Sequence, residues 1–310
     1  MEKRNGSSVT EFLLLGLSED PNIQVVLFML FLVIYLVTIM GNLFLITVCV
    51  HDPRLHIPMY FFLANLSFID ICYSSVIVPN LLNQLIMSKI MSFSRCAVQM
   101  YSYLLLGCTE SMVLAVMAYD RYIAISFPLR YTSIINTFVC VIYTAVCWII
   151  GSVMALLTMV FALHLPLCGN NVIDHFFCEV VTFLKMACGD IFIAQTMFFV
   201  VGTFVLLTPS LFILISYIRI VITIMGISSS KGRSKAFSTC ASHLIVVTMV
   251  SGTAIFMHMK PVSKHDDGQG KMVSVFYTVM PAMMNPIIYS LRNKDVKMAV
   301  HRLIWKNIHH

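Results

Sequence analysis

The sequence predicts an all-α membrane protein, a seven-transmembrane helix bundle with its N-terminus outside and a short amphipathic C-terminal helix. Three observations lead to this fold class: the composition, seven long segments poor in charge, and the uneven distribution of basic residues between the loops. Hydrophobic residue types make up 59% of the 310 residues and charged types only 11%. Soluble domains carry about 25% charged residues, and disordered chains have low hydrophobicity. The composition therefore argues against both a soluble enzyme and a disordered chain.

Each of the seven segments is long enough to cross the roughly 30 Å hydrocarbon layer of a bilayer as a helix. The expected spans cover residues 24–50, 57–82, 97–123, 137–163, 193–225, 236–259 and 272–291, within a transmembrane domain over 24–291. Asp70 is the only charged residue in the second span, and Glu110 interrupts the third well before its charged inner end. The sixth span is the weakest and has His243 near its start. Alternation with a period of two is absent, which argues against a membrane β-barrel.

The charges in the loops decide the sense in which the bundle crosses the membrane. With the N-terminus outside, the cytoplasmic segments hold 12 basic and three acidic residues, whereas the outer segments hold eight basic and nine acidic residues. Because basic residues concentrate on the cytoplasmic side of membrane proteins, we expect this orientation. The formal net charge of +6 follows from this topology and suits an anionic inner leaflet, so it implies no nucleic-acid partner.

The two ends of the chain lie on opposite sides of the membrane in this topology. Residues 1–23 form an extracellular tail without the pattern of a cleavable signal peptide, and Asn5 begins a glycosylation sequon there. Residues 292–310 form a cytoplasmic tail. Its apolar residues are spaced by three and four, which predicts an amphipathic helix lying on the membrane; they are Val296, Ala299, Val300, Leu303 and Ile304.

The ten cysteines fall into two groups. Six lie in spans or at their inner ends, where a cysteine usually acts as a small apolar packing residue. The other four are Cys96, Cys168, Cys178 and Cys188, all on the oxidising outer side, where disulfides are expected. Four cysteines allow three pairings, and their positions alone do not choose among them. A metal site at His175, Cys178 and Glu179 is an alternative, which a bridge at Cys178 would remove.

Four polar residues lie at a similar depth in the inner half of the predicted bundle. At 1.5 Å per helical residue, Asp70 lies about 20 Å and Glu110 about 16 Å from the inner ends of their spans. Asn42 and Asn285 belong to the same level. Ionisable residues inside a membrane usually face the bundle interior and serve a function. We expect a polar chamber that holds water or a sodium ion, the alternative being a neutral hydrogen-bonded network that fixes helix packing.

Nearly every span carries a short motif of its own. These motifs are Gly41-Asn42, Leu55-His56-Ile57-Pro58-Met59-Tyr60-Phe61-Phe62-Leu63, Met117-Ala118-Tyr119-Asp120-Arg121-Tyr122-Ile123-Ala124-Ile125, Trp148, Ser216-Tyr217, Lys235-Ala236-Phe237-Ser238-Thr239-Cys240-Ala241-Ser242-His243-Leu244 and Asn285-Pro286-Ile287-Ile288-Tyr289-Ser290-Leu291-Arg292-Asn293. In combination they resemble the olfactory receptors within the rhodopsin-like class of G-protein-coupled receptors. The resemblance covers about the whole chain, and the second, third and sixth stretches point specifically to olfactory receptors.

The resemblance implies a function and a mechanism. It implies disulfides Cys96–Cys178 and Cys168–Cys188, a small volatile odorant bound among the outer halves of the helices, and a stimulatory heterotrimeric G protein that raises cyclic AMP. On activation the sixth helix would swing outward and Arg121 would leave Asp120 to reach Tyr217. The residues implied in activation and coupling are Asp120, Arg121, Tyr122, Tyr217, Lys235, Asn285, Pro286 and Tyr289. The location would be the plasma membrane, in the cilia of olfactory neurons.

Helical spacing selects which residues of the third, fifth, sixth and seventh spans would face that ligand. They are Tyr103, Leu104, Gly107, Cys108, Val201, Gly202, Val205, Leu206, Ser251, Ala254, Ile255, His258, Tyr277 and Thr278. The alternative for any of them is packing or lipid contact. The set is apolar apart from a few hydroxyls and one imidazole, which suits a small, largely hydrophobic ligand held by one or two hydrogen bonds.

Three positions depart from the family's usual pattern. Val250-Ser251-Gly252-Thr253 replaces Phe-Tyr-Gly-Thr, His258 replaces a tyrosine, and Pro281-Ala282 replaces Thr-Pro. Besides the odorant receptor, two functions remain open at this point: a rhodopsin-like receptor for another small ligand, and an ion-coupled transporter that uses Asp70 and Glu110. An enzyme is disfavoured, because no nucleophile and base show recognisable spacing.

Overall fold

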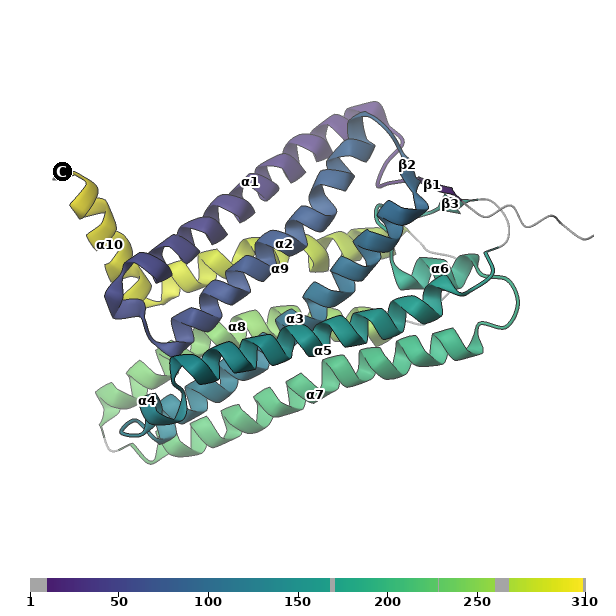
Figure 1. Cartoon of the computed structure of the whole chain (residues 1–310). Helices are drawn as coiled ribbons and strands as arrows, with labels where there is room; N and C mark the ends of the chain where they lie inside the picture. Colours follow the sequence, from purple (N-terminus) through teal and green to yellow (C-terminus); the bar gives the residue numbers. More distant parts are fainter. Residues whose placement is uncertain (1–9, 168–170, 228, 260–267, 309–310) are drawn as a thin grey trace, which may run out of the picture.

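The computed structural model describes residues 10–167, 171–227, 229–259 and 268–308. Its described part contains seven helices of 25 residues or more, which lie roughly along one direction (Figure 1). They are α1 Pro21–His51, α2 Pro58–Ile86, α3 Phe93–Ser126, α5 Thr137–Leu163, α7 Phe192–Met225, α8 Ser230–Met259 and α9 Gly268–Arg292. The shorter elements are β1 Glu11–Leu14, η1 Pro53–Leu55, β2 Ile90–Ser92, α4 Tyr131–Ile134, β3 Val172–Ile173, α6 Val180–Met186 and α10 Lys294–Ile308.

The predicted fold class, a seven-helix membrane bundle, is confirmed. Five helices, α1, α2, α3, α5 and α7, are long and apolar enough to cross a membrane by themselves, and α8 contains a shorter apolar stretch at Cys240–Gly252. The helix α8 begins at Ser230, six residues before the expected span, because its polar first turns continue the helix beyond the apolar segment. The sequence did not lead us to expect α4, α6 or the three strands.

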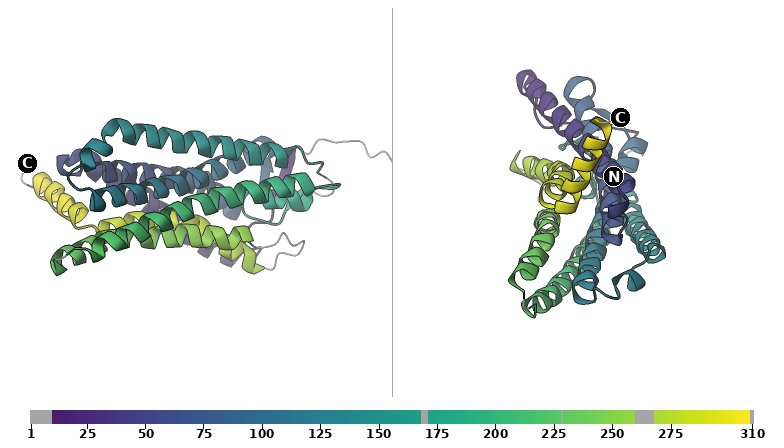
Figure 2. Two further views of the ribbon diagram at one scale, coloured as in Figure 1. Left: turned by 90° about the horizontal axis from the view of Figure 1, so that it is seen from below. Right: turned by 90° about the vertical axis from the view of Figure 1, so that its left-hand side faces the viewer.

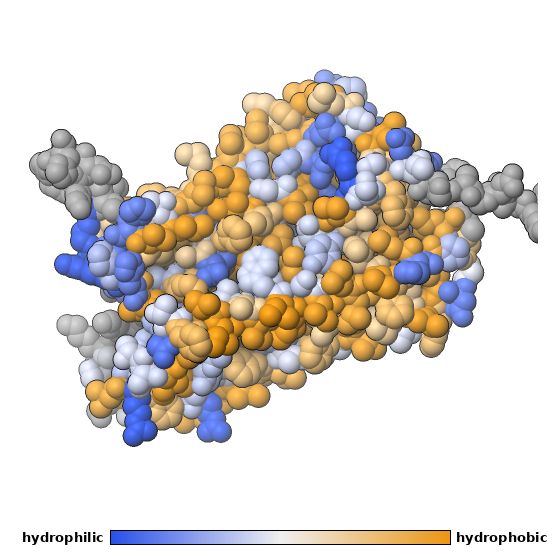
Figure 3. Space-filling view, in the orientation of Figure 1, coloured by the Kyte–Doolittle hydropathy of each residue, from blue (hydrophilic) through white to orange (hydrophobic). Residues whose placement is uncertain are grey.

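The outward faces of the bundle are apolar. Large hydrophobic side chains on α1, α5 and α7 are exposed, among them Val26 at 67%, Phe138 at 73% and Ile193 at 65%. Figure 3 shows apolar residues along the side of the bundle and the most hydrophilic groups toward its ends. Because a helix satisfies its own backbone hydrogen bonds, such a surface is stable against lipid tails. The exposed apolar side chains therefore form the surface that would face the lipid tails of a bilayer.

The helix ends follow local rules. Asp20 caps α1 by accepting the backbone N–H of Asn22 at 2.8 Å, and Pro21 stands at the first helical position, where a missing N–H costs nothing. Ser92 and Asn136 cap α3 and α5 in the same way. Prolines also occur inside helices: Pro79 in α2, Pro209 in α7, and Pro281 and Pro286 in α9. Neighbouring helices in a membrane bundle can supply the backbone partners that such prolines remove.

The helix α3 occupies the middle of the bundle and packs against α2, α5, α7 and α8, as the two views in Figure 2 allow the reader to follow. Small residues permit two of the close approaches between helices. A Cβ on Gly151 of α5 would lie 2.4 Å from the Thr109 hydroxyl of α3, and a Cβ on Gly41 of α1 would lie 3.2 Å from Pro286 of α9. Small residues let membrane helices approach closely, so the Gly41-Asn42 motif places α1 directly on α9.

A small sheet covers the extracellular end of the bundle. Its strand order is β2-β1-β3, with Phe12 of β1 opposite Met91 of β2 in an antiparallel pair and Leu13 opposite Val172 of β3 in a parallel pair. Residues 11–14 of the predicted tail are therefore ordered strand. Phe12 is 1% exposed and packs edge-on against Phe183 of α6. The tail, the first outer loop and the loop between α5 and α7 thus form one layer.

A disulfide joins this layer to α3. Cys96 and Cys178 are bonded, the first pairing that the resemblance implied. Gln99, one turn along α3, accepts the backbone N–H of Cys178 at 3.1 Å and donates to the Val76 carbonyl of α2. Cys188 is also disulfide-bonded, and Cys168 lies outside the described residues, as does Asn5. On the other side of the layer, Lys271 of α9 forms an ion pair with Asp174.

At the cytoplasmic end α10 turns away from α9 (Figure 1). Its residues Val296 and Ala299 are fully buried, as the amphipathic pattern requires. Arg302 of α10 donates to the carboxylate of Asp52, with Nη2 2.6 Å from Oδ2. The hydrogen bond from Arg302 is the main reason that the pKa of Asp52 lies below its usual value of 3.8. The Tyr60 hydroxyl donates to Asp295 at 3.1 Å, so α10 is held at two points along its length.

Candidate ligand-binding cavity and cytoplasmic network

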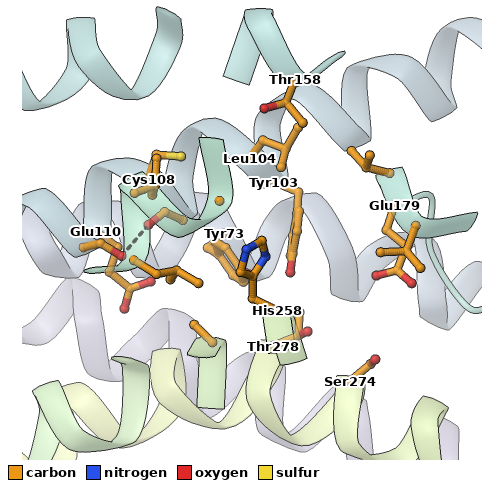
Figure 4. Close-up of a pocket in the computed structure, with 18 of the residues that line it drawn as sticks. Tyr73, Tyr103, Leu104, Cys108, Glu110, Thr158, Glu179, His258, Ser274 and Thr278 are labelled. Carbon is orange, nitrogen blue, oxygen red and sulfur yellow. Dashed lines mark hydrogen bonds between the residues drawn. The ribbon is translucent and has the colours of Figure 1, made fainter. Parts of the chain in front are cut away.

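A cavity of about 230 Å³ lies among the helices beneath the extracellular layer. Figure 4 shows Glu110 near one end, Glu179 near the other, and Tyr103 and His258 between them. The described residues that line it are Asp70, Tyr73, Tyr103, Leu104, Gly107, Cys108, Glu110, Ser111, Thr158, His175, Glu179, Val180, Val181, Lys185, Phe198, Val201, Gly202, Val205, Leu206, Val250, Ala254, His258, Ser274, Thr278, Pro281 and Ala282.

Eleven of the fourteen residues selected by helical spacing line this cavity. They are Tyr103, Leu104, Gly107, Cys108, Val201, Gly202, Val205, Leu206, Ala254, His258 and Thr278. Ser251 and Ile255 lie on α8 but are not among the described residues of the cavity wall. The side chain of Tyr277 lies outside the described part of the chain. All four residues selected on the third span and all four on the fifth line the cavity, whereas on α8 the lining residues are Val250, Ala254 and His258.

The wall also contains residues that helical spacing missed. His175, Glu179, Val180, Val181 and Lys185 come from the loop and from α6. Their signal in the sequence was Cys178: a bridge from this cysteine to the outer end of the third span draws the neighbouring loop residues over the bundle. The same bridge excludes the metal site considered at His175, Cys178 and Glu179, because a disulfide leaves Cys178 no thiolate.

An aromatic wall holds Tyr103 in place. Its ring centroid is 5.1 Å from that of Phe177 in the loop and 5.5 Å from that of Tyr73 in α2. Both distances lie in the range of favourable aromatic pairs. The Tyr103 hydroxyl makes no hydrogen bond with any residue that the structure describes, so it can donate to a ligand. The disulfide-bonded loop therefore shapes the cavity by setting the position of Tyr103.

The inner end of the cavity is polar. Asn285 of α9 donates to both carboxylate oxygens of Asp70, at 3.2 and 3.0 Å. Asn42 of α1 donates to the Ala282 carbonyl of α9 at 3.0 Å. Glu110 is close enough to Asp70 for their charges to interact. The structure therefore brings the four predicted polar residues into one region, where Glu110 Oε1, Asn285 Oδ1 and Asn42 Oδ1 are buried and lack a hydrogen-bond partner among the described residues.

A second network joins three helices near the cytoplasmic face. His243 of α8 has Nε2 3.1 Å from the Leu114 carbonyl of α3 and Nδ1 2.7 Å from the Tyr217 hydroxyl of α7. A carbonyl can only accept, so Nε2 carries the proton and Nδ1 accepts from Tyr217. In the sequence, His243 stands near the start of the weakest span and within the motif of residues 235–244. In the structure it connects α3, α7 and α8.

Two of the residues implied in coupling are associated with this network: Tyr217 bonds to His243, and Arg121 lies within electrostatic range of His243. Asp120 accepts the Tyr131 hydroxyl at 2.8 Å, and no ion pair between Asp120 and Arg121 occurs in the described part of the chain. Arg121 lies within electrostatic range of Asp120, Tyr217 and Tyr289.

The other coupling residues occupy several helices. Tyr122 packs on Phe127, with ring centroids 6.0 Å apart, and Pro286 is buried against Gly41. The Tyr289 hydroxyl is buried without a described partner. The side chain of Lys235 lies outside the described residues.

Comparison with known proteins decides the family. The sequence profile of the olfactory receptors matches residues 31–307. The chain belongs to the olfactory receptor family. Human olfactory receptor 2K2 is 50% identical over 307 residues, which cover 99% of this chain and 97% of that protein. Human olfactory receptor 13D1 is 48% identical over 311 residues, covering 100% of this chain and 90% of the relative. Olfactory receptor 5M5 of Mus musculus is 46% identical over 309 residues, covering 99% and 97%.

Membership settles the broad class of the protein. This olfactory receptor is a multi-pass membrane protein and a receptor rather than an enzyme. The relatives match it along nearly their whole length, so the described cavity and the cytoplasmic network lie in the region that this chain shares with these receptors. An ion-coupled transporter, the other class considered from the sequence, has no support from these relatives.

Proposed function

We propose that this receptor binds a small, largely hydrophobic volatile ligand in the outer-half cavity and activates a stimulatory G protein, which raises cyclic AMP. The observation that carries the proposal is the cavity of about 230 Å³ among the helices. Its middle combines aliphatic and aromatic side chains with a few hydroxyls and the imidazole of His258, while the carboxylates of Glu110 and Glu179 lie toward its two ends (Figure 4). Such a wall matches a ligand that is buried by apolar contact and oriented by one or two hydrogen bonds.

The helix α8 supplies the physical link between ligand and G protein. Its outer half places His258 at the cavity, and its inner half places His243 in the bonds to Leu114 and Tyr217. A ligand that binds better to one position of α8 shifts the population toward that position. Movement of the inner half would then exchange the His243–Tyr217 bond for one between Tyr217 and Arg121. The surface opened in this way would receive the G protein.

The test measures cyclic AMP in cells that carry the receptor on their surface and express a stimulatory G protein, against a broad panel of volatile compounds. We expect a dose-dependent rise that disappears in Arg121→Ala while ligand binding to membranes is retained. A response that survives in Arg121→Ala would contradict the coupling mechanism. If the surface-expressed receptor neither bound nor responded to any member of the panel, the proposal of a volatile ligand would be contradicted.

We also propose that a sodium ion is held between Asp70 and Glu110. The residues present fit such an ion: they are oxygen donors, as hard cations prefer, and Glu110 Oε1 and Asn285 Oδ1 are buried without a described hydrogen-bond partner. The apparent melting temperature of the purified receptor should be higher in sodium chloride than in potassium chloride. Asp70→Asn should remove the difference. Equal stability in the two salts would favour the neutral hydrogen-bonded network instead.

A further inference from the structure

The hydrogen bonds of His258 determine the tautomer of its ring. Nε2 lies 3.2 Å from the Phe199 carbonyl oxygen and 3.2 Å from the Thr203 hydroxyl, both on α7. A carbonyl oxygen can only accept, so Nε2 carries the ring proton, which the Thr203 oxygen shares. In the neutral ring Nδ1 then holds a lone pair and cannot donate. The fold has therefore turned this side chain into a hydrogen-bond acceptor.

That acceptor belongs to the cavity. His258 lines the cavity together with Gly202, and Nδ1 has no hydrogen-bond partner among the described residues. The ring is held in place from one side by Phe199, which stacks on it with centroids 5.3 Å apart and planes 17° apart. An acceptor that is positioned by stacking and by two hydrogen bonds at its other nitrogen loses little freedom when it binds a ligand.

Gly202 is the reason that the ring fits. A Cβ at this position would lie 2.3 Å from Cε1 and 2.8 Å from Nδ1 of His258, distances at which the ring must move. The ring therefore occupies the space that any other residue at 202 would fill. Moving the ring would break the hydrogen bond to the Phe199 carbonyl, and the ring proton would no longer be fixed on Nε2.

Other polar groups of the wall complement this acceptor. The hydroxyls of Ser111 and Thr158 already donate to backbone carbonyls of their own helices. The Tyr103 hydroxyl has no described partner, and the Thr278 hydroxyl is buried without one. Either can donate to a ligand oxygen. A ligand that also donates would satisfy His258, whereas a ligand that only accepts would leave Nδ1 buried and unpaired, which costs affinity.

We propose that Gly202 and His258 make this cavity selective for neutral ligands that carry a hydroxyl group, such as aliphatic alcohols and phenols. The ligand O–H would donate to Nδ1 of His258, and its oxygen would accept from Tyr103 or Thr278. The inference rests on the proposed odorant-binding function and adds the chemical class. A charged amine also donates, but beside the neutral imidazole of His258 it would lose its hydration at a high cost, since the carboxylates of Glu110 and Glu179 lie toward the two ends of the cavity (Figure 4).

The test compares alcohols and phenols with the methyl ethers of the same carbon skeletons, in cells that express the full receptor and a stimulatory G protein. Cyclic AMP output and ligand binding to receptor-bearing membranes are measured in parallel. Since one hydrogen bond changes affinity by up to roughly tenfold, each hydroxyl compound should be roughly tenfold more potent than its ether. Ethers that equal or exceed their alcohols would overturn the hydroxyl selectivity while leaving the receptor function intact.

Two variants assign the selectivity to this pair of residues. His258→Phe keeps a ring but removes the acceptor, so the alcohol and the ether should become about equally potent. Gly202→Ala should have the same effect by displacing the ring. Gly252→Ala is the matched control, because a Cβ on Gly252 of α8 meets nothing within 4 Å, and it should keep the tenfold preference. Surface staining identifies variants that fail to fold.

The outcomes separate this inference from the function on which it rests. Binding of alcohols without any cyclic AMP would contradict the proposed signalling and preserve the ligand class. An alcohol preference that persists in both His258→Phe and Gly202→Ala, with each variant at the surface, would show that other residues select the hydroxyl and would overturn the role of this pair.

Discussion

A single side-chain hydrogen bond determines how Asp120, near the charged end of α3, is held. Asp120 is 1% exposed, and its described partner is the Tyr131 hydroxyl of α4 at 2.8 Å rather than the adjacent Arg121. Burial raises the pKa of Tyr131, so this hydroxyl keeps its proton and donates. The second carboxylate oxygen, Oδ2, is buried without a described partner. Losing the one donor would therefore leave Asp120 with a large desolvation cost.

Tyr131→Phe should lower the free energy of unfolding by about 1–3 kcal/mol, the usual cost of leaving a buried acceptor unsatisfied. The measurement is the apparent melting temperature of the detergent-solubilised receptor, which should fall. Tyr143→Phe is the control, because its hydroxyl makes no hydrogen bond among the described contacts, and its effect should be small. Equal melting temperatures for Tyr131→Phe and the unchanged receptor would show that the Tyr131–Asp120 hydrogen bond does not stabilise the fold.

The close packing of the helices α3 and α5 depends on one glycine, Gly151. A Cβ on Gly151 would lie 2.4 Å from the Thr109 hydroxyl and 3.2 Å from the Leu105 carbonyl. The hydroxyl can move but the backbone carbonyl cannot, so the helices themselves would have to separate. Close packing of this kind replaces the hydrophobic effect as the force between helices in lipid.

Gly151→Ala should reduce the amount of folded receptor at the cell surface, because overpacking costs about 1–3 kcal/mol. Thr109→Ala in the same chain should restore part of the loss by removing the nearest atom. Surface immunofluorescence against total protein measures both. If the double variant reached the surface no more than Gly151→Ala, the contact with the Leu105 carbonyl would be the main cause of the loss. Normal surface expression of Gly151→Ala would show that the close approach of α3 and α5 is not needed for folding.

The docking of α10 should depend on pH. The pKa of Asp52 is lowered in the folded protein, chiefly by the hydrogen bond from Arg302. A carboxyl group with a depressed pKa stabilises the fold above its unfolded value, here 3.8, and the contribution is lost as the pH falls through the lower folded value. Between neutral pH and about pH 4 the contact should therefore hold, and below that it should weaken.

A spin label on the exposed residue Lys297 of α10 would report this change in nanodiscs. Label mobility should rise as the pH falls below 3.8, and Asp52→Asn should show the mobile spectrum already at neutral pH. Glu19→Gln, an exposed acid at the opposite end of the chain, serves as the control with normal docking. An immobile label in Asp52→Asn would mean that Val296, Ala299 and the Tyr60 contact hold α10 alone.

The whole molecule depends on the extracellular layer to close the cavity. Residues from β1, β2, β3 and α6 form this layer, and the Cys96–Cys178 bridge connects it to α3 across 82 residues of sequence. The bridge places Phe177 against Tyr103 and brings His175 and Glu179 to the cavity wall. Without it, the loop would gain conformational freedom and the wall would lose its outer side.

The double variant Cys96→Ser, Cys178→Ser should have a free energy of unfolding that is lower by about 2–5 kcal/mol, the typical cost of losing a native disulfide. Any receptor that still reaches the surface should have lost its ligand response. Cys72→Ser, at a free and partly exposed cysteine, should have neither effect. A bridge-free receptor with unchanged ligand potency would show that the strands hold the loop without covalent help.

The sequence by itself determined the fold class, the orientation, the family and much of the cavity. These properties depend on local quantities: the length of apolar segments, the charge of the loops, and the spacing of residues along one helix. Spacing placed Tyr103 and Gly107 on one face of the third helix and Val201 and Val205 on one face of the fifth, and these residues line the cavity. The cysteines on the outer side pointed to a bridge, but only the resemblance chose its partners.

The tertiary structure alone decided the properties that depend on relative rotation and on distant contacts. On α8, helical spacing selected Ala254 and His258 but also Ser251 and Ile255, and it missed Val250, because the rotation of this helix follows from packing against α7 and α9. The acceptor character of His258 depends on a carbonyl 59 residues away, at Phe199. The partner of Asp120 lies 11 residues along the chain, in Tyr131. Hydrogen bonds are short-ranged and directional, so only the folded arrangement specifies them.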